Sequence, residues 1–154
     1  PTVKGIQLLN DEGEHMLLSS RNDWLRDSPE IRAEILARLE DWDAYSNSNP
    51  RNGIIEAIRR YYDPEDPKQI SLYVYSDDFA QGGGSIASVV REVDARNRAR
   101  GADQPMVRIH AVAFPVFHDR TGQMYTGADY AVLMRVLCQR NGGTFVALPS
   151  RRDG

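Results

Sequence analysis

From residue 54 to residue 148 the sequence alternates between helical and strand patterns, and this alternation limits the fold more than any other feature. Apolar residues recur at helical spacing in three segments, and an apolar, β-rich run follows each of them. The order is helix, strand, helix, strand, helix, strand. This order is typical of a parallel sheet whose strands are joined by helices. We therefore expect an α/β fold, Rossmann-like and doubly wound, with a mostly parallel sheet.

The strand expected at residues 70–75 indicates how that sheet is packed. Ile70, Leu72 and Val74 alternate with large aromatic residues, so both faces of the strand carry bulky side chains. Interior strands of a parallel sheet have this composition because helices cover both of their faces. We therefore expect this strand to lie inside the sheet, with helices on both faces of the layer.

The first third of the chain predicts a hairpin and a helix. Residues 3–9 and 15–19 are apolar-rich runs separated by residues 10–14, which contain turn formers. This pattern predicts an antiparallel hairpin at the edge of the sheet. Residues 27–30 supply an N-cap, a proline and an early acid, which begin an amphipathic helix. Residues 46–53 then form a polar loop that leads into the next helix.

Two further helix ends are marked by local residues. Ser85 is expected to cap the helix that follows it, because its hydroxyl can accept a hydrogen bond from a free backbone N–H. The last helix, which carries Tyr130 and Cys138, is expected to end at Gly142 and Gly143 in a left-handed C-terminal cap. Residues 144–148 then form the final strand.

Length and composition limit the class of protein. A chain of 154 residues with 41% apolar and 27% charged residues predicts a single folded domain over residues 1–154, with a flexible tail at 149–154. The net charge of −3 argues against nucleic acid as a partner. No apolar run reaches the ~20 residues that span a bilayer, so we expect no membrane insertion. Cys138 is the single cysteine, and the cellular compartment stays open.

The best candidate for a chemical site follows the strand at residues 70–75. Asp77 and Asp78 come directly after this strand, and ligands of open parallel sheets bind beyond the carboxyl ends of the strands. A carboxylate on a rigid strand end suits a hard cation, so Asp77 is the first candidate ligand for Mg²⁺ or Mn²⁺. In the alternative interpretation, both acids cap the following turn or are simply solvated.

Other motifs carry a weaker signal. Residues 82–85 place three glycines and a serine before a helix, but they lack the lysine of a phosphate-binding P-loop. The histidines have no partners at zinc-site spacing. His118 is the one histidine expected near the ligand edge. We expect Ser48, Asp78 and His118 to contribute to contacts with a ligand or partner.

Five segments together resemble the von Willebrand factor A (VWA) domain family. Residues 4–10 and the run that continues to Leu18 resemble its edge hairpin, and residues 52–58 resemble the start of its "T-x-L-x-x-A-L" helix. Residues 70–78 look like its apolar strand followed by "S-D-G". Residues 107–114 resemble "I-x-x-I-G-F", and residues 133–146 resemble "L-x-x-L-A-x-x-x-G-G-x-F". The order and spacing of the five segments agree over nearly the whole chain.

The resemblance implies protein or matrix recognition through a metal-ion-dependent adhesion site. In such a site, a bound Mg²⁺ completes its ligand shell with an acidic side chain of the partner. Of the family's metal ligands, the aspartate after the fourth strand corresponds to Asp77, and the threonine position corresponds to Asn52. The amide oxygen of Asn52 has an alternative role as a cap of its own helix.

The chain departs from the family at its beginning. The family's first strand and its D-x-S-x-S loop should precede the hairpin, and this sequence has no counterpart of either. Because that strand is central to the family's sheet, its omission would expose unpaired backbone. We therefore expect the domain to be incomplete at its N-terminal end, with an upstream segment or a second chain completing the sheet. The metal site is expected to be incomplete without that segment.

Three functions are compatible with these observations, and the third is a purely structural domain without a bound ion. The first is a VWA-like protein-binding or adhesion module, not an enzyme, with a protein partner. The alternative is a Mg²⁺-dependent hydrolase or phosphoryl-transfer enzyme that uses Asp77 and Asp78. This alternative requires a lysine or a second acidic cluster nearby, which the sequence does not show.

Overall fold

The computed structural model describes residues 2–21, 23–42, 49–79, 84–98, 104–114 and 124–149. Its elements, in chain order, are β1 (Gly5–Ile6), the 3-10 helix η1 (Leu18–Ser20), β2 (Leu25–Arg26), α1 (Pro29–Asp41), α2 (Pro50–Tyr61), β3 (Ile70–Ser76), α3 (Ile86–Arg96), β4 (Val107–Ala113), α4 (Met124–Arg140) and β5 (Phe145–Ala147). This is a Rossmann-like α/β fold, as the alternation of patterns predicts. None of the described helices is both long and apolar enough to cross a membrane.

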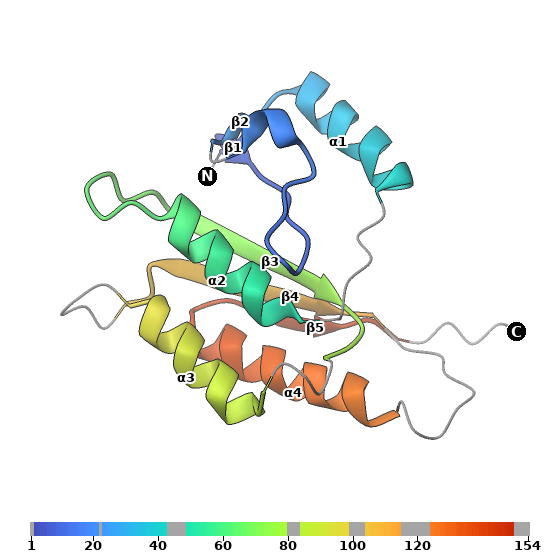
Figure 1. Ribbon diagram of the computed structural model, residues 1–154, viewed down its shortest axis with the longest axis vertical. Coiled ribbons are helices and arrows are strands. Elements are labelled where there is room, and N and C mark those ends of the chain that lie inside the picture. Colours follow the sequence, from blue (N-terminus) through green and yellow to red (C-terminus); the bar gives the residue numbers. More distant parts are fainter. Residues whose placement is uncertain are drawn as a thin grey trace, which may run out of the picture.

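The main sheet has the order β3-β4-β5, and both pairings are parallel. The pairing of β3 with β4 runs in register from Ile70 opposite Val107 to Ser76 opposite Ala113. Helices α3 and α4 make the two crossover connections (Figure 1). The predicted parallel arrangement is therefore confirmed for the part of the sheet that the structure describes.

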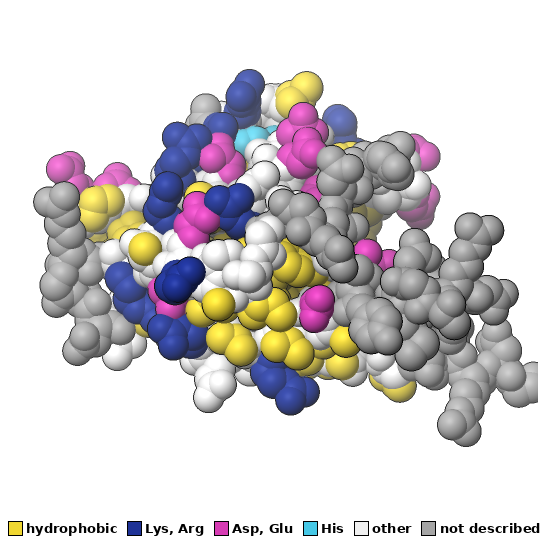
Figure 2. Space-filling view, turned by 60° about the horizontal axis from the view of Figure 1, so that its bottom comes forward, with side chains coloured by type: hydrophobic (Ala, Val, Ile, Leu, Met, Phe, Trp, Pro, Cys, Tyr) yellow, Lys and Arg dark blue, Asp and Glu magenta, His cyan; other side chains and the backbone are white. Residues whose placement is uncertain are grey.

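Helices α2, α3 and α4 all pack on one face of this sheet. Their buried side chains form a single cluster with those of the strands: Ile54, Ile58, Phe79, Val89, Val93, Val107, Ile109, Ala111, Ala113, Tyr130, Leu133, Met134, Leu137 and Cys138. The side of the molecule formed by α3 and α4 also carries apolar side chains at its surface, with Lys and Arg around them (Figure 2). The core is therefore the space between one sheet face and one layer of helices.

The opposite sheet face is open within the described residues, which corrects the expectation of helices on both faces. Tyr73 is 55% exposed and Tyr75 is 61% exposed, whereas Leu72 and Val74 on the same strand pack against the core. Strand β3 lies at an edge of the described sheet and not in its interior. The two tyrosines led to the wrong prediction of a covered face, because a phenol ring is bulky enough for a core and polar enough for a surface.

The N-terminal part forms its own small sheet, and the predicted hairpin is wrong in its pairing. Strand β1 pairs antiparallel with β2, and the expected partners meet at one isolated bridge, between Leu9 and His15. The Gln7 side-chain amide donates hydrogen bonds to the Ser20 carbonyl (2.9 Å) and the Asp23 carbonyl (2.6 Å). These contacts accompany the turn of the chain into η1, where a second hairpin strand was expected.

The helix starts agree with the caps that the sequence predicts, with one difference. The Ser28 hydroxyl accepts the Ile31 N–H at 3.2 Å, and the Ser85 hydroxyl accepts the Ser88 N–H at 3.2 Å. Helix α2 begins at Pro50, within the stretch expected to be a loop. Proline suits the first turn of a helix because its fixed backbone angle is already helical and its missing N–H has no partner there.

The end of α4 depends on two glycines for different reasons. Gly142 has φ of 66°, the left-handed conformation expected for a helix C-terminal cap. At Gly143 a Cβ atom would lie 1.9 Å from the carbonyl oxygen of Ile109, so any side chain there would collide with β4. The first glycine reverses the chain, and the second lets it pass close to β4 before β5 begins.

Two buried asparagines fix the start of β4. Asn97 donates from its side chain to the Val107 carbonyl (2.7 Å) and to Asn141 Oδ1 (2.8 Å), and it accepts the Val107 N–H at 2.9 Å. Asn141 also donates to the Leu137 carbonyl at 2.8 Å. Both asparagines are fully buried. They join the ends of α3 and α4 to the first residue of β4.

We predict that Asn97→Ala destabilises the protein by about 2–4 kcal/mol, because it leaves buried backbone groups of Val107 without partners. Urea unfolding followed by circular dichroism measures this. The control is Gln139→Ala, at an exposed position of α4, for which we expect a change below about 0.5 kcal/mol. Equal stabilities of the two variants would contradict the assigned role of Asn97.

Candidate functional site

The carboxyl ends of the three parallel strands meet at one edge of the sheet, which we call the rim. Asp77, Phe114 and Leu148 follow β3, β4 and β5 there, and all three are exposed. The N-terminal ends of α2 and α4 lie toward the same edge (Figure 1). Asp77 therefore stands where ligands of open parallel sheets bind. Sequence reasoning placed Asp77 at this edge but did not identify the two apolar neighbours.

Asp78 has a different environment from Asp77. Its Oδ1 accepts the backbone N–H of Phe79 at 2.6 Å, and the Ser76 hydroxyl donates to its carbonyl at 3.3 Å. Phe79 is buried in the core. The Asp78 carboxylate thus holds the turn that directs Phe79 inward, while Asp77 faces solvent.

Asn52 lies exposed in the first turn of α2. Its backbone N–H donates to the Asn49 carbonyl at 3.3 Å, and its Oδ1 accepts a hydrogen bond from Arg51 Nη1 at 3.4 Å. Arg51 in turn forms an ion pair with Glu92 at 2.6 Å. The Asn52 amide oxygen is therefore engaged by its neighbour and does not cap the helix. Ser48 and His118 lie outside the described residues.

The residues present do not by themselves fit a resident divalent ion. Mg²⁺ takes about six oxygen ligands, and protein sites usually supply more than one carboxylate or bound phosphate. Among the described residues, no group of three or more His, Cys, Asp and Glu side chains is placed to hold a metal ion. Asp77 is a single rim carboxylate, and Asp78 is committed to its own turn.

Asp11 forms a contact with the start of α2 that the sequence did not predict. Its Oδ2 accepts the Asn49 N–H at 2.8 Å, and its carbonyl accepts the Gly53 N–H at 2.7 Å. A carboxylate at a helix N-terminus pairs free N–H groups and opposes the positive end of the helix dipole. No local pattern reveals this cap, because Asp11 is 38 residues away from Asn49. The contact ties the N-terminal turn to the start of α2.

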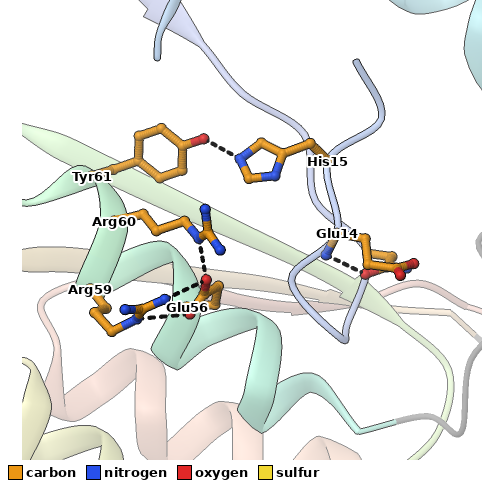
Figure 3. Close-up of polar contacts among 7 residues, drawn as sticks. Glu14, His15, Glu56, Arg59, Arg60 and Tyr61 are labelled. Carbon is orange, nitrogen blue, oxygen red and sulfur yellow. Dashed lines mark hydrogen bonds and ion pairs between the residues drawn. The ribbon is translucent and has the colours of Figure 1, made fainter. Parts of the chain in front are cut away.

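A second polar cluster ties the same segment to the other end of α2 (Figure 3). The buried His15 ring shares a hydrogen bond through Nε2 with the Tyr61 hydroxyl, and the Trp24 ring meets the Tyr61 ring edge-on at 4.9 Å. Burial lowers the pKa of His15, and the nearby charges of Arg60 and Arg21 lower it further. His15 is thus favoured in its neutral form.

Glu56 completes this cluster one turn earlier on α2 (Figure 3). It forms ion pairs with Arg59 (2.8 Å) and with Arg60. The hydrogen bond from Arg59, with that from Arg60 and the two positive charges, lowers the pKa of Glu56 to about 2. Because Tyr61 ends α2, the His15–Tyr61 contact lies at the far end of the helix from the rim. We interpret this cluster as the joint between the N-terminal part and the sheet domain, not as a reactive centre.

Tyr130 of α4 is the buried polar group associated with the rim. Burial raises the pKa of its hydroxyl, and proximity to the Cys138 thiol and the Asp77 carboxylate raises it further. The hydroxyl forms no hydrogen bond of ordinary geometry with a described residue, although the backbone of Ser76 is close enough to lower the pKa in part. Tyr130 is therefore a neutral core side chain whose hydroxyl has no hydrogen-bond partner among the described residues.

Comparisons with known proteins show no family for this chain. No family model matches it, and no curated protein matches it. A similar solved structure is that of an aerotolerance-related membrane protein from Bacteroides fragilis NCTC 9343, in a form with multiple mutations to serine. The two are 11% identical, with a TM-score of 0.43, over 81% of this chain and 64% of that chain. This chain thus spans less than two thirds of that protein's length, and its fold assignment depends on the strand order described above.

We predict that stability falls with pH below His15's unfolded-state pKa of 6.5. Its pKa is lower in the folded protein, so the unfolded chain binds the proton more tightly. The stabilisation is complete above that pKa and is lost as pH falls through the folded-state value. Urea midpoints between roughly pH 7.5 and 5.5 should decline for the native chain and decline less for His15→Gln. His110→Gln is the matched control, and an equal decline in both variants would contradict the role of His15.

Proposed function

We propose that this chain is a VWA-like protein-binding module and not an enzyme, with its contact surface at the rim. One observation carries the proposal: each parallel strand leads into an exposed rim side chain, one carboxylate (Asp77) and two apolar groups (Phe114 and Leu148). Protein interfaces combine apolar and aromatic anchors with a few charges at their margin. This rim has that composition on a rigid base.

The VWA resemblance supports the same surface. In that family the aspartate after the fourth strand lies at the recognition edge, and Asp77 occupies the corresponding position after β3. The parallel order β3-β4-β5 is consistent with the resemblance. Recognition through Asp77 would use its negative charge directly, toward a basic or hydrogen-bond-donating group of the partner protein.

A resident ion is not part of this proposal, since the described rim offers one uncommitted carboxylate. The hydrolase alternative needs two free acids, and Asp78 is engaged with Phe79. Neither the metal-assisted interpretation nor the hydrolase has a specific observation in its favour. Both remain outcomes of the tests below.

The partner is sought by placing a photoreactive phenylalanine at position 114 and identifying the protein that crosslinks to it. With the purified partner, we predict that Asp77→Asn raises Kd about tenfold and that Phe114→Ala raises it about tenfold to a hundredfold. Arg96→Ala is the control, because Arg96 is exposed at the end of α3 away from the rim; we expect less than about a twofold change. If both rim variants bind like the native chain, the rim is not the contact surface.

We also predict that the partner's affinity is the same, within about twofold, in EDTA and in millimolar Mg²⁺. Binding calorimetry measures both conditions for the native chain and for Asp77→Asn. Loss of affinity in EDTA, seen in the native chain and abolished in Asp77→Asn, would favour the metal-assisted interpretation. Hydrolysis of p-nitrophenyl phosphate that depends on Mg²⁺ and Asp77 would favour the hydrolase.

A further inference from the structure

The open sheet face is a second surface, separate from the rim along most of its length. The register places Tyr73 beside His110, Tyr75 beside Val112, and Val112 beside Val146, all on this face. Tyr73 stacks on His110 with ring centroids 4.7 Å apart and an interplanar angle of 15°. Side chains held in this way form a fixed apolar surface, and exposed surfaces of this kind mark association sites.

Helix α1 carries a complementary surface. Ala33, Leu36, Ala37 and Leu39 are all exposed, with Leu36 at 65% and Leu39 at 46%. Residues three and four apart lie on one side of a helix, so Ala33, Leu36 and Ala37 share one side of α1, and Leu39 lies next to Leu36 at its border. We call this side of the helix the α1 stripe. Small side chains let a helix approach closely, and the bulky rings of the open face fill the space between.

The dimensions of the two surfaces match. The 13 residues of α1 extend roughly 20 Å, and a seven-residue strand such as β3 extends roughly 23 Å. Three adjacent strands span about 14 Å across the sheet, and a helix with its side chains is about 10–12 Å across. One helix lying along the strands therefore covers most of the open face.

The charges of the two surfaces are also complementary. Arg108 is exposed on the open face, and the strand residues of that face include no acid. Glu40 is exposed near the end of α1 and, four residues after Leu36, lies within the α1 stripe. Neither Arg108 nor Glu40 forms an ion pair with another described residue. A helix placed on the face can bring these charges together.

From this match we propose that two copies of the chain form a two-fold dimer in which the α1 stripe of each copy packs on the open sheet face of the other. A second copy is required because α1 is held elsewhere in its own chain. The Asp27 N–H donates to the Lys4 carbonyl at 3.0 Å, and Asp27 also pairs with Arg32. His15 joins this N-terminal part to α2, on the covered side of the sheet. Helix α1 thus lies apart from the three strands of the main sheet of its own chain (Figure 1).

The buried area of this two-fold arrangement is large enough for a stable dimer. In a two-fold dimer each copy buries both its open face and its α1 stripe. A fully enclosed aromatic side chain buries on the order of 150–250 Å², and Tyr73 and Tyr75 expose more than half of theirs. Together with Val146 and the α1 stripe, each copy buries on the order of 800 Å², the area typical of a specific interface. The Phe114 ring of the rim stacks on Tyr75 with centroids 6.4 Å apart, so the dimer surface adjoins the rim, but the proposed dimer does not use Asp77.

The first test is sedimentation velocity of the native chain over a concentration series. The expected species has twice the 17.4 kDa chain mass at micromolar concentration. Leu36→Glu and Tyr73→Glu should each raise the dimer Kd at least a hundredfold. Val132→Glu is the matched control, since Val132 is 51% exposed on the helix-covered side, and its Kd should change less than threefold. The proposal is overturned if the native chain stays monomeric from micromolar concentration up to concentrations 100-fold higher.

A charge reversal tests the orientation and keeps the test valid if an apolar variant misfolds. Arg108→Glu alone and Glu40→Arg alone should each raise the dimer Kd about tenfold. The two changes in one chain should restore the native Kd to within threefold, because each copy then presents the reversed pair. A double variant no tighter than the singles overturns the proposed orientation. Circular dichroism verifies that each variant is folded.

Crosslinking identifies which copy supplies the helix. Cys138 is buried, so thiols introduced by Leu36→Cys and Tyr73→Cys are the ones that a short bis-maleimide can reach. Mixing the two single variants should give a crosslinked pair, whereas Leu36→Cys mixed with Val132→Cys should give none. In the Leu36→Cys/Tyr73→Cys double variant, a crosslink within one chain at high dilution would show α1 on its own sheet and would overturn the exchange. A rim variant such as Asp77→Asn should leave the dimer unchanged, so the two proposals can fail separately.

Discussion

The in-register parallel pairing of β3 with β4 is the constraint on which the rest of the structure depends. Paired residues lie on the same face, so this register assigns Leu72 and Ile109 to the core and Tyr73 and His110 to the open face. It also sets where both strands end, and therefore where Asp77 stands. A slip of one residue in β3 would turn its tyrosines inward and its core side chains outward. The core, the open face and the rim are thus consequences of one alignment.

Buried hydrogen bonds and one close approach hold that alignment. Asn97 fixes both backbone groups of Val107, the first residue of β4, and Asn141 links this point to α4. At the other side of β4, Gly143 passes so close to Ile109 that no other residue fits. A shift of the first residue of β4 would break these hydrogen bonds, and it is unfavourable because a buried amide without a partner costs free energy. The polar groups of the interior therefore specify the register as well as stabilise the fold.

The features that follow from short stretches of sequence could be predicted, and those that join distant residues could not. The Ser28 and Ser85 caps and the left-handed Gly142 are local rules, and the alternation of helix and strand is a pattern along one segment. The Asp11 cap and the side-chain bonds of Gln7 join residues far apart, and no spacing signals them. The Tyr73 and Tyr75 pattern fits a buried face and an open one equally well, so only the packing of the helices decides between them.

The distribution of polar groups is consistent with the proposed binding role. Perturbed pKa values often mark active sites, but in the described part of this chain each has a structural cause. Burial in the α4 core raises the pKa of Cys138 to about 11, and the joint to α2 accounts for His15 and Glu56. These groups hold elements together and lie within or behind the helix layer. The side chains that remain available at the sheet are exposed rings, aliphatic groups and single charges. A rigid surface of that kind suits recognition of another protein surface by shape and by a few charge contacts, as proposed for the rim and the open face.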